Sequence, residues 1–172
     1  MKRSSIEPDE YNSFYHTYLR LIDDEAQLLD SLEKGKELTL RFYGAIPQGK
    51  LHYAYAEGKW TVLEVLQHII DTERIFGYRV LRLARNDRTE LPGFEQDDYI
   101  KPAMANGRSV DELLDEYTAV RQSTLQLIKG INPESMGFIG RVSGGNLSAR
   151  AAAFIIVGHE IHHANIVSER YL

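Results

Sequence analysis

The sequence predicts an all-α protein built as a single four-helix bundle. Four long stretches repeat apolar residues at helical spacing, their ends carry capping or helix-ending residues, and no set of segments alternates as strands do. The four stretches are residues 24–43, 61–86, 109–129 and 148–171. A length of 172 residues suits one domain, so we assign 1–172 to it and treat 1–23 as a lead-in.

The lead-in is rich in large aromatic and aliphatic side chains, and we expect a short helix or an irregular aromatic segment there. These side chains are Tyr11, Phe14, Tyr15, Tyr18, Leu19 and Ile22. The first long helix follows over residues 24–43, although Gly35 weakens its middle. Gly44 and Pro47 end it, because neither residue favours continuing a helix.

The helix predicted over residues 61–86 has the clearest start signal in the chain. Thr61 and Glu64 form a capping box, in which each side chain can bind the other residue's backbone N–H. The preceding segment, 47–59, is predicted to be a loop. Residues 87–108 form a long connection, and such connections are usually functional or partly ordered by a short helix.

Serine residues mark the starts of the last two long helices. Ser109 caps the third, Glu112 completes a second capping box, and Gly130 ends that helix. Residues 133–147 contain four glycines and predict a small hairpin or an Ω-like loop. Ser148 then caps the final helix.

Composition excludes several classes of function. The chain has 20 Lys plus Arg and 25 Asp plus Glu, a net charge of −5, which argues against a nucleic-acid partner. It has no cysteine, which excludes disulfides, zinc–thiolate sites, thiol nucleophiles and iron–sulfur clusters and fits a reducing compartment. The longest apolar run, 151–158, is too short to span a bilayer, and no signal peptide is recognisable. We therefore expect a cytoplasmic protein with no membrane partner.

The final helix carries a possible metal-binding motif. His159, Glu160 and His163 fit the pattern H-E-x-x-H, and residues four apart lie on the same face of a helix. His159 and His163 could therefore direct two imidazoles at one metal ion. The alternative interpretation is that these histidines only satisfy local hydrogen bonds.

A third ligand must come from earlier in the chain. Peptidases with this motif take it from a later residue, but the position six residues past His163 is Glu169 and no later helix follows. We therefore expect no peptidase activity. His68, at the margin of an apolar helical face, is the best candidate, with a hydrogen-bonded core histidine as the alternative. His16 and His52 are expected to be exposed and to bind nothing.

One histidine from one helix and two from another would make a three-histidine site. Neutral imidazoles with open coordination positions suit one divalent metal, namely zinc, nickel, ferrous iron or manganese. The open positions would bind water or a substrate heteroatom.

Several segments resemble the DinB-like (YfiT-like) metalloenzyme superfamily in order and spacing. They are GKWTVLEVLQHIIDTER at 58–74, RVLRLAR at 79–85, LPGFEQDDY at 91–99 and GHEIHH at 158–163. The resemblance implies a four-helix bundle and a metal held by His68, His159 and His163. It also implies a homodimer acting on a small-molecule substrate, because homodimers are common in this family.

That family includes thiol-dependent S-transferases and isomerases. The resemblance therefore implies a metal-dependent enzyme, either a transferase using a low-molecular-weight thiol or a hydrolase. Two alternatives stay open: a non-catalytic metal-binding bundle, and an interaction protein whose histidines are incidental. A closed coordination sphere would favour the non-catalytic metal-binding bundle. A protein that does not bind added metal would favour the interaction protein.

Two residues near the expected ligands have both a functional and a structural interpretation. Glu160 is a candidate general base, but it points about 100° away from His159 on a helix and could instead pair with Arg74 or Arg79. Asp71 could orient a ligand ring or could form a salt bridge. His162 belongs to the same motif and is a further candidate for supporting a ligand.

Four residues are candidates for contacting substrate. Tyr55, Asp97 and Tyr99 lie in predicted loops that could border a pocket. Arg79 begins a basic stretch that either covers the surface of the bundle or receives an anionic substrate. Gly158 lies inside the final helix, where glycine is unfavourable by roughly 1 kcal/mol, and so predicts the close approach of a neighbouring helix that brings His68 within metal reach.

Overall fold

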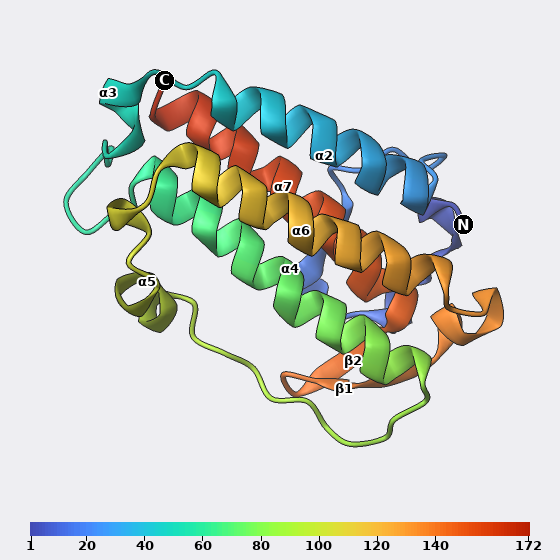
Figure 1. Ribbon diagram of the computed structural model, residues 1–172. Helices are drawn as coiled ribbons and strands as arrows, with labels where there is room; N and C mark the ends of the chain where they lie inside the picture. Colours follow the sequence, from blue (N-terminus) through green and yellow to red (C-terminus); the bar gives the residue numbers. More distant parts are fainter.

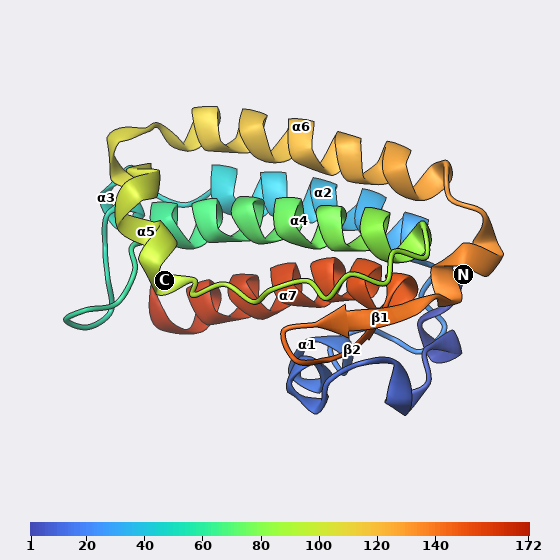
Figure 2. The ribbon, with the colours of Figure 1, turned by 90° about the horizontal axis from the view of Figure 1, so that it is seen from below.

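Four long helices pack side by side in the computed structural model, which describes residues 1–172 (Figures 1 and 2). They are α2 (Leu28–Gly44), α4 (Val62–Ala84), α6 (Val110–Lys129) and α7 (Ala149–Arg170). Helices α2 and α4 each pack against both α6 and α7, so α2 lies diagonally across the bundle from α4. This arrangement confirms the predicted four-helix bundle.

Side-chain caps set three of the four helix starts where the sequence predicts them. The Thr61 hydroxyl accepts a hydrogen bond from the Glu64 N–H, and the Glu64 carboxylate accepts one from the Thr61 N–H. Ser109 makes the same reciprocal pair at the start of α6, and Ser148 accepts from the N–H of Ala151 at the start of α7.

Helix α2 begins four residues later than predicted because the chain terminus holds the preceding residues. Lys2 forms an antiparallel bridge with Gln27, and the Leu28 N–H donates to the Met1 carbonyl. The N–H of Arg3 also donates to the carbonyl of Ala26. These long-range bonds leave no freedom for a helix to start at residue 24, and local sequence does not reveal them.

Short helices order the lead-in and the connections. The lead-in contains α1 (His16–Leu19), and the two long connections contain α3 (Gln48–Leu51) and α5 (Asp97–Ala103). Single 3₁₀ turns occur at Arg3–Ser5, Pro8–Glu10, Ser13–Tyr15, Ala105–Gly107 and Pro133–Gly137. From the end of α4, the chain runs as an extended segment along the bundle to α5 (Figure 2).

A β-hairpin precedes α7 and joins three distant segments. Strands β1 (Ile139–Val142) and β2 (Gly145–Ser148) pair antiparallel through a two-residue turn. Both turn residues have positive φ, 52° and 78°, which matches the twist of a tight hairpin. Leu91 of the α4–α5 connection bonds to β1, and Tyr11 of the lead-in bridges to β2.

The apolar core consists of two clusters, one toward each end of the bundle. Between them lies a layer of buried polar side chains, which includes Glu73, Arg121, His159 and Glu160. None of the helices has the length and apolar character needed to cross a membrane.

Candidate metal centre

Three imidazoles meet in the polar layer of the bundle. Helix α4 supplies His68, and α7 supplies His159 and His163 from consecutive turns. The Nε2 atom of His159 lies 3.0 Å from Nε2 of His68 and 3.1 Å from Nε2 of His163. Ligand atoms from the three rings all lie within 4.8 Å of one another, so the fold brings together the three predicted ligands.

Burial keeps these rings neutral at ordinary pH. The pKa of His68 falls to about 4, because burial disfavours the charged ring more than the nearby Asp97 carboxylate favours it. The pKa values of His159 and His163 lie well below the usual range, again through burial and then through repulsion from neighbouring imidazoles. Neutral imidazoles are the form that binds metals.

Hydrogen bonding alone accounts poorly for the close approach of the three rings. Each neutral imidazole nitrogen carries either one proton or one lone pair. Nε2 of His159 can therefore bond to both His68 and His163 only as a bifurcated hydrogen bond, in which both neighbours share one proton or one lone pair. In every other combination of tautomers, at least one of the two short contacts opposes like groups. A cation among the three lone pairs removes this conflict, and three nitrogen donors from two helices suit a divalent first-row metal with open positions.

A cavity of about 350 Å³ reaches His68 and His159 from outside the bundle. Its walls come from α4, the lead-in, the α4–α5 connection and the turn of the hairpin. The Tyr18 ring stands edge-on to His159 with ring centres 5.3 Å apart. The Thr72 hydroxyl, one turn past His68 on a residue lining this cavity, is buried and has no hydrogen-bond partner. Such an unsatisfied group is typical of a site that receives a ligand or ordered water.

Gly158 allows the lead-in to reach the site. A Cβ atom on Gly158 would lie 2.4 Å from the carbonyl oxygen of Tyr18, which is too close for any side chain. The predicted close approach is therefore present, but the neighbour is α1 and the residue brought to the centre is Tyr18. His68 arrives independently through the packing of α4 against α7.

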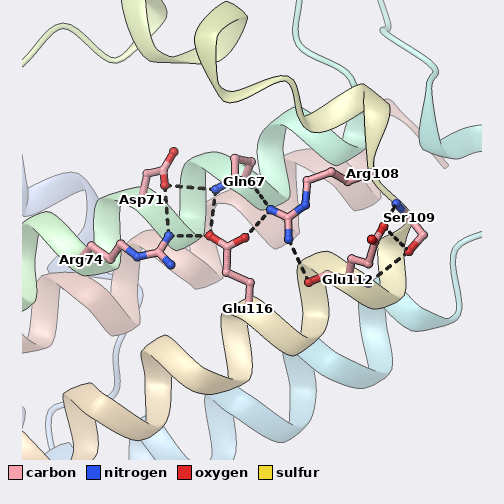
Figure 3. Close-up of polar contacts among 7 residues, drawn as sticks. All are labelled: Gln67, Asp71, Arg74, Arg108, Ser109, Glu112 and Glu116. Atoms are coloured by element: carbon pink, nitrogen blue, oxygen red, sulfur yellow. Dashed lines mark hydrogen bonds and ion pairs between the residues drawn. The ribbon is translucent and has the colours of Figure 1, made fainter.

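Asp71 bonds to residues other than a histidine. Its carboxylate accepts hydrogen bonds from the Gln67 amide at 3.1 Å and from Arg74 at 3.4 Å (Figure 3). Gln67 and Arg74 also bond to Glu116 of α6, and Arg108 joins the same network (Figure 3). The contacts of the Asp71 carboxylate match its interpretation as a salt-bridged residue.

Glu160 points into the centre of the bundle. Its Oε2 accepts a hydrogen bond from Arg121 at 2.6 Å and another from the Tyr117 hydroxyl. The alternative of an ion pair was therefore right in kind, but its partner is Arg121 of α6 and neither of the arginines considered, Arg74 and Arg79. In this arrangement the Glu160 carboxylate stabilises the packing of the helices.

The remaining candidates differ in their distance from the cavity. Arg79 lines it, and Tyr99 lines a small adjoining pocket that also reaches His68. Asp97 lies close enough to influence His68, as described above. Tyr55 instead packs on Tyr171 near the end of α7, with ring centres 5.1 Å apart, and does not line the cavity.

The other histidines lie outside the group of three. The His162 ring is half-buried, with its centre 5.3 Å from that of Tyr18 and 5.1 Å from that of His163, and it makes no hydrogen bond. His16 and His52 are exposed, as predicted.

Sequence reasoning missed two residues that shape the cavity. Tyr18 was visible only as one of several aromatic residues in the lead-in. Thr72 follows His68 by four residues and so shares its helical face, which was the available signal.

Comparison with known proteins identifies relatives of this chain. The family model described as the DinB superfamily matches residues 31–167. No curated protein matches the sequence. The structure is similar to that of YfiT from Bacillus subtilis, with a TM-score of 0.76, 14% identity, and coverage of 95% of this chain and 90% of that chain. YfiT is described as a probable metal-dependent hydrolase with an unusual four-helix bundle topology.

Proposed function

The chain belongs to the DinB superfamily, and on this premise we propose that it is a metal-dependent enzyme of the hydrolase type. His68, His159 and His163 would hold one divalent cation. The observation that carries the proposal is the pair of Nε2 contacts at 3.0 and 3.1 Å, which neutral rings can satisfy only by sharing one proton or one lone pair, whereas a cation would engage a lone pair from each ring.

The cavity supports catalysis over a purely structural role for the metal. A bound cation would act as a Lewis acid and would lower the pKa of a bound water toward neutrality. Three protein ligands leave coordination positions open, and the cavity gives a small molecule access to them. The Thr72 hydroxyl is free to hold a proton or donate a hydrogen bond beside His68, and the Tyr18 ring shields His159 from water.

Thiol transfer is the second candidate reaction. The chain contains no cysteine, so any thiol must enter as a separate low-molecular-weight molecule. A screen of activated esters, amides and electrophiles with and without such thiols distinguishes the two reactions. Turnover without thiol supports hydrolysis, and strict thiol dependence supports transfer. Cleavage of casein that is sensitive to chelators would contradict the expected lack of peptidase activity.

Metal analysis of untagged protein tests the site itself. We expect about one divalent metal per chain, since the chain offers one group of three histidines. His68→Ala should lose most of this metal, whereas the matched variants His16→Ala and His52→Ala should keep it, because those rings are exposed and lie outside the group. Full occupancy in His68→Ala would refute the site.

A further inference from the structure

Arg79 is a buried cation in the wall of the cavity. Its exposed fraction is 3%, and it lies eleven residues after His68 on α4, which places both residues on the same face of that helix. Their Cα atoms are separated by roughly 16 Å along the helix at 1.5 Å per residue. Helical side chains lean toward the N-terminus, so the guanidinium leans back toward His68.

No carboxylate balances this cation. One nitrogen of Arg79, Nη2, donates to the carbonyl of Pro92 at 3.2 Å and to the hydroxyl of Ser143 at 3.3 Å, and both acceptors are neutral. No acidic group lies within 4.0 Å of the guanidinium. The rings of Phe76 and Phe94 pack against it, and the Cζ atom of Arg79 lies 4.8 Å from the first ring centre and 5.7 Å from the second.

Other arginines in this protein show what a balanced guanidinium looks like. Arg121, which is fully buried, bonds to two carboxylates, and the partly buried Arg150 bonds to that of Glu10. Arg82, one turn beyond Arg79, pairs with Asp87. A buried charge without a partner is unfavourable, and burial accordingly lowers the pKa of Arg79. Glu95, the only acidic residue lining the cavity, is exposed and forms no ion pair.

We propose that Arg79 binds the oxyanion group of a small anionic substrate whose reacting group lies at the three histidines. This inference rests on the proposed function and specifies its substrate class. The remaining donors of the Arg79 guanidinium, which also lies beside the Tyr15 hydroxyl, suit a carboxylate or a phosphate, and the Ser143 hydroxyl offers a further hydrogen bond. The Phe76 and Phe94 rings packed against the guanidinium favour a ligand with an apolar body.

Equilibrium binding of benzoate, with benzamide as its neutral counterpart, tests this proposal. Measurements on chelated protein remove any direct contact between the carboxylate and a metal. The wild type should bind benzoate at least about tenfold more tightly than benzamide, because a charge-assisted pair is worth more than a neutral hydrogen bond. Arg79→Met should abolish that preference, whereas Arg82→Met, one turn away on the same helix, should keep it. Inorganic phosphate, measured in parallel, shows whether a phosphate or a carboxylate is preferred.

The melting temperature and the metal content of each variant separate an effect on the anion site from an effect on folding or on metal binding. Arg79→Met should melt no lower than the wild type, because it replaces an unpaired buried charge with an unbranched apolar side chain. A benzoate preference that persists in Arg79→Met, or a large drop in its melting temperature, would overturn the proposal. If Arg79→Met loses the benzoate preference and the wild type also takes up no metal, the anion site is supported and the metal centre is refuted. Normal metal content with no benzoate preference in the wild type would refute the anion site alone.

Discussion

Arg121 is the residue whose replacement should cost the fold most. Its guanidinium donates to both oxygens of Glu73 at 2.8 and 2.9 Å, to Glu160 at 2.6 Å and to the carbonyl of Leu32 at 2.8 Å. These partners lie on α4, α7 and α2, and Arg121 itself lies on α6. One side chain therefore connects all four long helices at the middle of the bundle.

Arg121→Met should lower the free energy of unfolding by about 3–5 kcal/mol. That is the typical cost of removing one partner from a buried ion pair, and here the substitution leaves both Glu73 and Glu160 without a cation. Total stabilities are roughly 5–15 kcal/mol, so the variant should lose a large share of its stability. Arg121→Lys should recover only part of the loss, because an ammonium group cannot reproduce the planar fork.

Urea unfolding followed by far-ultraviolet circular dichroism measures this loss. Lys129→Met is the matched control on the same helix, because its ion pair with Glu33 is exposed and should contribute under about 1 kcal/mol. Adding Glu73→Gln and Glu160→Gln to Arg121→Met should restore more than half of the lost stability, since no charge of this cluster then remains buried. A loss no larger than that of the control would refute the reasoning.

Three further predictions concern the lead-in and the metal. Gly158→Ala should destabilise by about 1–2 kcal/mol, as measured by urea unfolding, because the clash with the Tyr18 carbonyl outweighs the better helix propensity of alanine; a neutral effect would contradict it. Burial raises the pKa of Glu10, but hydrogen bonds, chiefly from Arg150, outweigh it and lower the pKa overall; Glu10→Gln should therefore melt lower than the wild type at pH 7, with a difference that shrinks as pH falls below about 4.5. Removing the metal with a chelator should lower the melting temperature modestly and leave the helical signal intact, because both core clusters are independent of the histidines; loss of most helicity would indicate a structural metal.

Local signals predicted the helices and the ligands because each depends on residues only a few positions apart. The capping boxes at Thr61 and Ser109 mark their helix starts to the residue. The spacing of His159 and His163 likewise fixes them on one face of α7. His68 needed a further step, because only the packing of α4 against α7 brings it to the other two.

Features that depend on distant segments could not be read from the sequence. Arg79 and Arg82 look alike in one basic stretch, yet Pro92 and Ser143 enclose the first while Asp87 neutralises the second. The hairpin and the lead-in that complete the cavity carry no local pattern that reveals where they pack. The same limit hid Arg121 as the partner of Glu160, because 39 residues separate them.

Adjacent residues on α7 divide the chemistry of the bundle between two environments. His159 faces the other imidazoles and the cavity, and Glu160 turns about 100° away into the ion cluster with Arg121. Because a helix is rigid over one residue, anchoring Glu160 to Arg121 also fixes the rotation of α7 and hence the direction of the His159 ring. The glutamate of H-E-x-x-H would thus act as a positioning residue here. Glu160→Gln, which keeps a hydrogen-bonding oxygen, should therefore retain metal far better than Glu160→Ala. Equal metal content in the two variants would show that the contact between Glu160 and Arg121 does not position the metal ligands.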